Sequence, residues 1–261
     1  MTMVLFFEYI GRTVLGVLDY LGAIFMLLME CLSGIAKGTV RFGLAVQQMA
    51  FLGVDSLVIV ILTTTSAGMV ISLQLAHIAV QYGVVSVVGG GVAIAMAREL
   101  APMLTAVVVA GRAGSAIAAE IGTMKVTEQI SALKCMAVSP VRYLVVPRLI
   151  ALVTMMPLLT LFSLTFGTLG GAVIAYQSAN IPYEVFWDSI QRLLVLSDVS
   201  YGLLKGVVFG FEVALIACYQ GLNTGRGAAG VGASTTSSVV YATIFIFISN
   251  YLMSLWLFPV S

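Results

Sequence analysis

Long apolar segments without a charged residue recur along this chain, and they decide where it can fold. Leu149 to Tyr176 and Ser237 to Pro259 contain no Asp, Glu, Lys or Arg. A helix of about 20 mostly apolar residues crosses the hydrocarbon core of a bilayer, which is about 30 Å thick. Only 9% of the 261 residues are charged and 61% are hydrophobic, whereas soluble domains carry about 25% charged residues. The sequence therefore predicts an all-α integral membrane protein.

Five segments are predicted to span the membrane, and together they form one transmembrane domain over residues 51–261. The second span is predicted although it places Arg98 and Glu99 in the membrane interior, and the fourth contains Lys205 and Glu212. In chain order, the five predicted spans are about 56–76, 84–110, 149–176, 199–221 and 237–259.

Residues 1–50 are predicted to be a separate N-terminal region. Its apolar run from Leu21 to Met29 is too short to cross a bilayer. At 100° per residue, its charged side chains fall in a helical sector of roughly 60°. These residues are Glu8, Arg12, Asp19, Glu30, Lys37 and Arg41. We expect an amphipathic helix lying in the membrane interface, and the alternative is a sixth, poor span.

Basic residues mark alternate loops, which indicates the orientation. Because cytoplasmic loops are enriched in Lys and Arg, these loops are predicted to be cytoplasmic. The residues concerned are Lys37, Arg41, Lys125, Lys134, Arg142, Arg148 and Arg226. The opposite loops are uncharged or lean acidic, so the N-terminus is expected inside and the C-terminus outside. No cleavable signal peptide is recognised at the N-terminus.

The outer loop between the third and fourth spans has structure of its own. Asn180 and Pro182 provide helix-start chemistry, and apolar residues follow at helical spacing from Phe186 to Leu194. We expect a short amphipathic helix on the outer surface.

The segment from Gly111 to Arg148 is too polar for a span and too regular for a flexible linker. A helix is predicted over about 120–138, ended by Ser139-Pro140 because proline disfavours helix in the residue before it. Such a cytoplasmic helix either docks on a soluble subunit or simply closes the bundle.

This segment also carries a family resemblance. The string GRAGSAIAAEIGTMKVTEQISALKCMAVSPVRYLVVPR, residues 111–148, closely resembles the signature of the MlaE/YrbE permease family. RELAP at 98–102 and the stretch 201–240 extend the resemblance over most of the chain after about residue 50.

The resemblance implies the permease subunit of an ABC transporter. Such a subunit moves phospholipid or a related lipid between the membrane and an extracytoplasmic MCE-domain partner. A separate cytoplasmic ATPase dimer binds ATP and Mg, so no cofactor and no catalytic residue is expected on this chain. The resemblance also agrees with a homodimer, and the absence of a transit-like N-terminus favours a bacterial inner membrane. Residues 120–138 would be the coupling helix, with Glu120, Gly122, Glu128 and Gln129 as contacts to the ATPase.

Four ionisable residues inside the spans are predicted to line the translocation cavity: Arg98, Glu99, Lys205 and Glu212. Each costs about 2.5–3.5 kcal/mol at mid-membrane unless it faces a cavity or partner. Counted at 1.5 Å per residue from the outer surface, Arg98 and Glu212 both lie about 20 Å deep. We therefore predict that they pair, and that Lys205, about 9 Å deep, meets a lipid phosphate. The alternative is a purely structural network.

Two sequence features that could suggest a nucleotide site or a catalytic site are not interpreted as functional. GRGAAG at 225–230 fits GxGxxG, but it joins two membrane spans and no strand precedes it, so it is not a nucleotide site. His77 is the only histidine, which leaves no HExxH motif and no Ser-His triad. No metal ligand set is recognised, and the three widely spaced cysteines suggest no disulfide framework.

Glycines in the spans predict close helix packing in lipid. They are Gly89 to Gly91, Gly167, Gly170 and Gly171. Two further classes of function compete with the permease. The buried charges favour an ion-coupled secondary carrier, against which no internal repeat is seen. An intramembrane hydrolase would need a catalytic arrangement of serine and acid that is not recognised.

Overall fold

The computed structural model describes residues 2–36 and 42–258, and before residue 18 it describes the side chains of residues 11, 12, 15 and 16 only. Lys37, Arg41 and the side chain of Glu8 therefore lie outside the described residues, as does the end of the predicted span at 259. Within the described ranges every secondary-structure element is a helix, and turns and short irregular stretches connect the helices. The predicted all-α membrane fold is confirmed.

By length and composition, six helical stretches of the described chain can cross a membrane. Five of them overlap the five predicted spans and the sixth lies near the N-terminus. They are Leu18–Ala36, Phe42–Tyr82, Val85–Val126, Val141–Ala179, Leu196–Leu222 and Gly227–Leu257. Several are longer than predicted, because they continue past the apolar segments.

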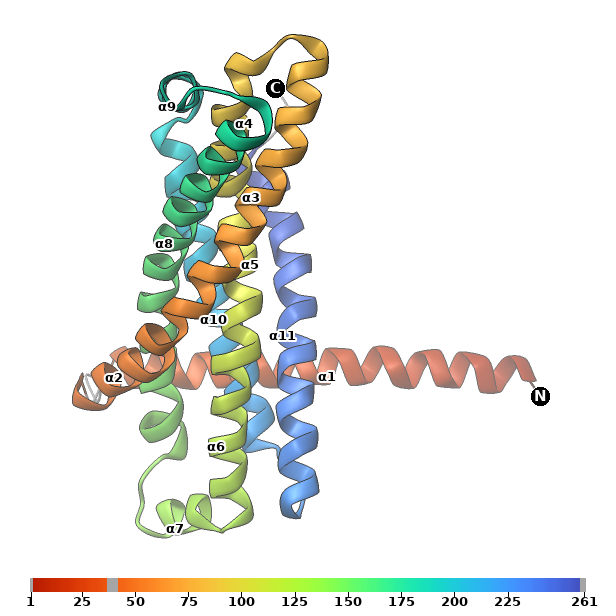
Figure 1. Cartoon of the computed structure of the whole chain (residues 1–261). Coiled ribbons are helices and arrows are strands. Elements are labelled where there is room, and N and C mark those ends of the chain that lie inside the picture. Colours follow the sequence, from red (N-terminus) through yellow and green to blue (C-terminus); the bar gives the residue numbers. More distant parts are fainter. Residues whose placement is uncertain (1, 37–41, 259–261) are drawn as a thin grey trace.

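The N-terminal helix stands apart from the other long helices. Helix α1 (Thr2–Ala36) lies across the bundle instead of along it (Figure 1). Near its middle, Gln220 donates a hydrogen bond to the Tyr20 hydroxyl at 3.2 Å. Near its end, the Ser139 hydroxyl donates to Glu30 Oε1 at 3.3 Å. Its direction relative to the bundle is the one expected of a helix lying in the interface.

The first two bundle helices are each assembled from consecutive segments. The first consists of α2 (Phe42–Gln48), η1 (Met49–Gly53), η2 (Val54–Ser56) and α3 (Leu57–Tyr82). The second consists of η3 (Val85–Val87), α4 (Val88–Ala95), η4 (Met96–Leu100), α5 (Ala101–Val109), η5 (Ala110–Gly114) and α6 (Ser115–Val126). Segments η1, η4 and η5 are single π-helical turns, which often occur at functional sites.

The remaining elements are the short helix α7 (Gln129–Cys135) and, after a π-helical turn η6 (Val141–Val145), the long helix α8 (Val146–Ala179). They are followed by α9 (Tyr183–Leu193), α10 (Leu196–Leu222) and α11 (Gly227–Leu257). Helices α7 and α9 lie at opposite ends of the bundle (Figure 1). Among the six candidate spans α10 is the most enclosed.

Small residues allow the close packing of α3 against α8. The buried residues of α3 recur every four positions, so they form one stripe; they include Val60, Thr64, Gly68, Ser72 and Ala76. A Cβ on Gly68 would collide with the carbonyl oxygen of Gly167. The Ser72 hydroxyl donates to the Gly171 carbonyl at 2.6 Å. Close approach at Gly167 and Gly171 is thus confirmed.

Helix α9 is the short helix predicted between the third and fourth spans. Asn180 ends α8 in the left-handed conformation, and Pro182 precedes the first turn of α9. A Cβ on Gly89 would collide with the backbone of Phe186, and the amide of Gly90 donates to the Ser189 hydroxyl at 2.9 Å. This end of the bundle is therefore closed by backbone contact between α4 and α9.

The predicted helix over 120–138 is wrong in its boundaries. The helix that begins at Val85 runs on to Val126, so Gly111–Val126 continues the second span. The chain then reverses at Glu128, whose φ of 60° is left-handed, and only Gln129–Cys135 forms a separate helix. Apolar residues such as Ile117 and Ile121 are fully buried in the bundle. They hold the segment in the long helix despite its polar residues.

Candidate functional site

The candidate site begins with an unusual stretch of the second span. Arg98 and Glu99 lie in the π-helical turn η4, and Pro102 follows in the first turn of α5. In an α-helix the carbonyl of Arg98 would accept from the N–H of residue 102, but proline has none. The sequence therefore leaves a carbonyl open for another donor inside the membrane.

Lys205 of α10 provides that donor. Its side chain is fully buried, and its ammonium lies 2.8 Å from the Arg98 carbonyl, 2.9 Å from Glu99 Oε1 and 2.7 Å from the Ser254 hydroxyl. An ammonium has three N–H donors, and each has an acceptor here. The predicted contact of Lys205 with a lipid phosphate is therefore wrong, because the ammonium is enclosed by the protein.

Glu99 joins three helices. Besides Lys205, its carboxylate accepts from Asn250 at 2.8 Å and contacts the Ser254 hydroxyl at 2.7 Å, both on α11. The Glu99 side chain remains 38% exposed. It is therefore anchored at one side and open at the other.

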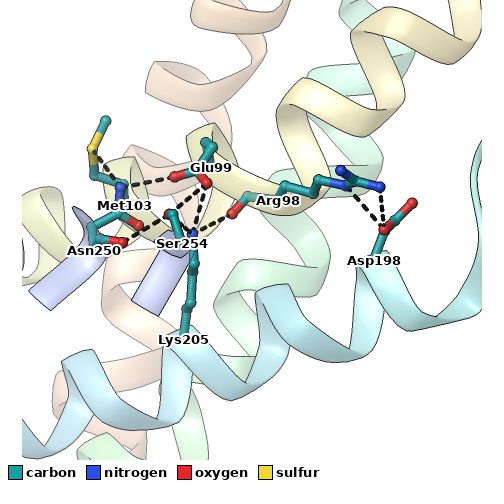
Figure 2. A network of polar contacts seen from close by, with 7 residues as sticks. All are labelled: Arg98, Glu99, Met103, Asp198, Lys205, Asn250 and Ser254. Atoms are coloured by element: carbon teal, nitrogen blue, oxygen red, sulfur yellow. Dashed lines mark hydrogen bonds and ion pairs between the residues drawn. The ribbon is translucent and has the colours of Figure 1, made fainter. Parts of the chain in front are cut away.

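Arg98 points away from Glu99 along α10, as Figure 2 shows. Its guanidinium contacts Asp198 Oδ1 at 2.9 and 3.0 Å and lies over the Phe258 ring at 4.5 Å. The Asp198 side chain is 3% exposed, and it also accepts from the backbone N–H of Val195 at the start of α10. The predicted pair of Arg98 with Glu212 is wrong.

Glu212 lies seven residues after Lys205 on α10, and its contact is separate from the network of Arg98, Glu99 and Lys205. Its carboxylate accepts from the Ser249 hydroxyl of α11 at 2.9 Å. Asp198, Lys205 and Glu212 follow one another at intervals of seven residues, so they lie on one face of α10. Depth counted from an assumed entry point selected the wrong acid of this series for Arg98.

A pocket of about 380 Å³ opens beside this network. Its polar wall consists of Arg98, Glu99 and Ser254. The rest of the lining is mostly apolar: Ile94, Ala95, Tyr251, Leu255 and Phe258. Partly exposed charges thus meet an apolar surface, which is the pairing that the headgroup and chains of an amphiphile require.

The four residues predicted to couple to an ATPase separate into two groups. Glu120 pairs with Arg148 at 2.6 Å, and Gly122 packs so closely that a Cβ would lie 2.6 Å from the Thr224 hydroxyl. Both residues make contacts within the chain, and the Glu120 side chain is also 49% exposed. Glu128 and Gln129 are exposed at the turn before α7.

The turn before α7 is shaped by local hydrogen bonds. Glu128 accepts from the Ser131 hydroxyl at 2.6 Å, and Gln129 donates to the Thr127 hydroxyl at 3.1 Å. Of the four candidates, only Glu128 and Gln129 therefore present their side chains at the tip of this end of the bundle.

Sequence reasoning missed three members of the network: Asp198, Asn250 and Ser254. The predicted fourth span begins at residue 199 and leaves Asp198 in the outer loop before it, although the spacing of seven residues between Asp198 and Lys205 is a usable signal. Asn250 and Ser254 are four residues apart in a nearly apolar span, and that spacing puts two polar groups on one face.

The described side chains contain no group of three or more His, Cys, Asp or Glu residues that could hold a metal ion. The chemistry of this site is ion pairing and hydrogen bonding next to an apolar pocket.

Comparisons with known proteins agree on one family. The profile of the family described as Permease MlaE matches residues 45–256. A protein of Synechocystis sp. named probable ABC transporter permease protein is 45% identical over 235 residues, which cover 90% of this chain and 89% of the relative.

Two further relatives come from other lineages. A probable ABC transporter permease protein of Rickettsia bellii is 37% identical over 251 residues, 96% of this chain and 97% of the relative. The chloroplastic protein TRIGALACTOSYLDIACYLGLYCEROL 1 of Arabidopsis thaliana is 38% identical over 224 residues, 86% of this chain and 64% of the relative.

Proposed function

The chain belongs to the MlaE permease family of ABC transporters, and we propose that it is the subunit through which phospholipid or a related lipid passes. In this proposal the lipid moves between the inner membrane and an extracytoplasmic MCE-domain partner. A cytoplasmic ATPase dimer, which holds ATP and Mg, drives the movement. Family membership favours this mechanism over the ion-coupled carrier.

One observation carries the proposal. Arg98 and Glu99 are each 38% exposed at a pocket whose other walls are mostly apolar. Arg98 forms an ion pair with the buried Asp198, and Glu99 forms one with the buried Lys205. Fixed charges of both signs can bind a zwitterionic or anionic headgroup without rearrangement, while the apolar walls accept its chains. The name of the Arabidopsis relative, which contains that of a diacylglycerol lipid, agrees with this substrate class.

The orientation in the proposal follows the charge of the loops. The end that carries α7 bears Lys125, Lys134 and Arg226 and is taken as cytoplasmic. The network of Arg98 and Glu99 then lies toward the outer leaflet, where lipid would pass to the MCE partner. Residues 1–50 form an N-terminal region whose amphipathic helix α1 lies in the cytoplasmic interface. Residues 51–261 form the permease domain.

The turn before α7 is the proposed contact with the ATPase. Glu128 and Gln129 are exposed there, so their charged and amide groups can bond to another subunit. Glu120 and Gly122 act indirectly, because their contacts with Arg148 and Thr224 fix the end of the long second helix. Because ATPase subunits of this class of transporter act as pairs, two copies of the chain assemble around one lipid path.

Purification in mild detergent from the native membrane, followed by mass spectrometry, tests the proposal. We expect recovery of an ATPase subunit, an MCE-domain protein, a second copy of this chain and bound phospholipid. A chain recovered alone, which still moves lipid in vesicles without ATP, would overturn the proposal.

A further inference from the structure

A second pocket, at the other end of the molecule, has no role in the lipid path proposed above. It measures about 820 Å³ and lies between α7 and the loop that joins α10 to α11. This volume falls within the roughly 300–1,000 Å³ typical of ligand sites. We call it the α7–α11 pocket, and its lining includes Lys125, Ile130, Lys134, Leu222, Gly225 and Arg226.

Three cations of this pocket lack a counter-charge, in contrast to five other cations of the described chain; Arg142, which is not part of the lining, also has no ion pair there. Arg98, Arg112, Arg148, Arg192 and Lys205 each pair with a carboxylate. Within the described residues, Lys125, Lys134 and Arg226 have no ion pair and no side-chain hydrogen bond. They come from three elements, yet they line one pocket. Their charge is therefore available to an anion.

The two acids in the described lining form no ion pair with these cations and offset only part of their charge. Glu128 accepts a hydrogen bond from the Ser131 hydroxyl, and Glu30 of α1 accepts one from the Ser139 hydroxyl. With both acids counted as ionised, the lining still carries one net positive charge from three cations and two carboxylates.

The start of α11 adds a second source of positive potential. Arg226 is its N-cap residue and makes no side-chain cap, and Gly227 follows with φ of 70°. The first N–H groups of a helix have no carbonyl partner within the helix, and with the helix dipole they favour an anion. Here that helix start belongs to the same lining as the three cations.

Packing within the chain holds this loop in place. The hydroxyl of Thr224 donates to that of Ser234 at 2.9 Å, and Gly122 of α6 lies against Thr224. Gly230 approaches the backbone of Gly225 so closely that a Cβ would lie 2.5 Å from it. The glycines of GRGAAG thus serve a tight loop at a helix start, and the pocket is preformed.

We infer that the α7–α11 pocket binds the phosphate headgroup of an anionic phospholipid of the cytoplasmic leaflet, as a fixed lipid and not as transported cargo. Two observations select a lipid over a soluble anion. The partly exposed apolar residues Val126, Val141 and Leu222 lie beside the cations. Glu30 brings α1, the helix proposed to lie in the interface, to the rim. The inference uses the proposed orientation and requires that the proposed ATPase contact at Glu128 and Gln129 leaves the pocket open, but it is independent of the outer network.

Native mass spectrometry of the full chain in detergent tests the inference. The probes are phosphatidylglycerol and phosphatidylcholine with the same acyl chains. The unmodified chain is expected to retain phosphatidylglycerol preferentially. Because each cation near a membrane surface contributes roughly a fivefold effect, the K125Q/K134Q/R226Q variant is expected to bind on the order of 100-fold more weakly.

Two further variants guard against misfolding and against binding elsewhere. K125R/K134R/R226K keeps the charges and is expected to retain phosphatidylglycerol. R192Q, which removes an exposed cation of α9 that pairs with Asp188, is expected to bind normally. Unchanged binding in the triple Gln variant, or no preference for phosphatidylglycerol in the unmodified chain, would overturn the inference.

Two competition experiments determine whether the anion bound in the pocket comes from a lipid, from soluble phosphate or from the ATPase subunit. Inorganic phosphate that displaces phosphatidylglycerol at equal concentration would assign the pocket to a soluble anion and overturn the lipid. Loss of phosphatidylglycerol when the ATPase subunit binds would assign the cations to carboxylates of that partner. Failure of the outer network to transport lipid would change none of these readouts, so the two proposals fail separately.

Discussion

Lys205→Met is the substitution whose consequences the structure defines most fully. It removes three hydrogen bonds and the cation that faces Glu99. Removing one partner of a buried ion pair costs about 3–5 kcal/mol. Because Glu99 is 38% exposed, part of its charge can be solvated, so we expect about 2–4 kcal/mol here.

Glu99→Gln is expected to cost at least as much, because Lys205 is fully buried and has no route to water. The double variant Lys205→Met/Glu99→Gln leaves no uncompensated charge in this pair. The amide introduced at position 99 can still form hydrogen bonds with Asn250 and Ser254. We therefore expect the double variant to be more stable than either single variant.

Thermal unfolding of the purified chain in mild detergent measures this cycle. At about 2–4 °C per kcal/mol for a chain of this size, Lys205→Met is expected to lower Tm by about 5–15 °C, and the double variant by less. Arg192→Met, in an exposed pair with Asp188, should shift Tm by no more than about 2 °C. A double variant whose loss equals the sum of the two single losses would refute the reasoning.

Three further predictions concern packing and coupling. Gly68→Ala forces a methyl group into the Gly167 carbonyl and should cost about 1–3 kcal/mol or more; an unchanged Tm would argue against the α3–α8 contact. Gly122→Ala should displace the loop at Thr224 and increase its amide hydrogen exchange, whereas unaltered exchange would show that the loop does not depend on this contact. Glu128→Lys should lower lipid-stimulated ATPase activity of the purified complex without reducing membrane insertion, and full activity would remove Glu128 from the coupling contact.

The membrane fold could be predicted because it depends on local composition. Apolar runs of sufficient length identified five bundle helices, and Pro182 with the apolar spacing after it identified α9. Close packing at Gly167 and Gly171 followed from residue size alone. These features need no knowledge of which helices are neighbours.

The pairing of the buried charges could not be predicted in the same way. Depth counting assumes a uniform rise from a known entry point, and the π-helical turn at Met96–Leu100 breaks that assumption. It also treats Asp198 as part of a loop, whereas Asp198 lies in the first turn of α10 and is buried. The true partners are set by three-dimensional packing.

The boundary at Glu128 was missed for a different reason. Left-handed backbone is usually adopted by Gly or Asn, and this residue is neither. No residue-type rule would therefore have divided the predicted helix there. The division matters, because it assigns Glu120 and the buried Gly122 to α6 and leaves the turn that follows to Glu128 and Gln129.

ATP-dependent transfer of phospholipid tests the central claim most directly, with the chain reconstituted in vesicles together with its ATPase. The paired substitution Arg98→Ala/Glu99→Gln also lowers Tm, because it leaves Lys205 and Asp198 unpaired. We predict that it abolishes transfer at a temperature at which the variant still assembles with the ATPase. Transfer at the unmodified rate in that variant would contradict a role for the Arg98 and Glu99 pocket in the lipid path.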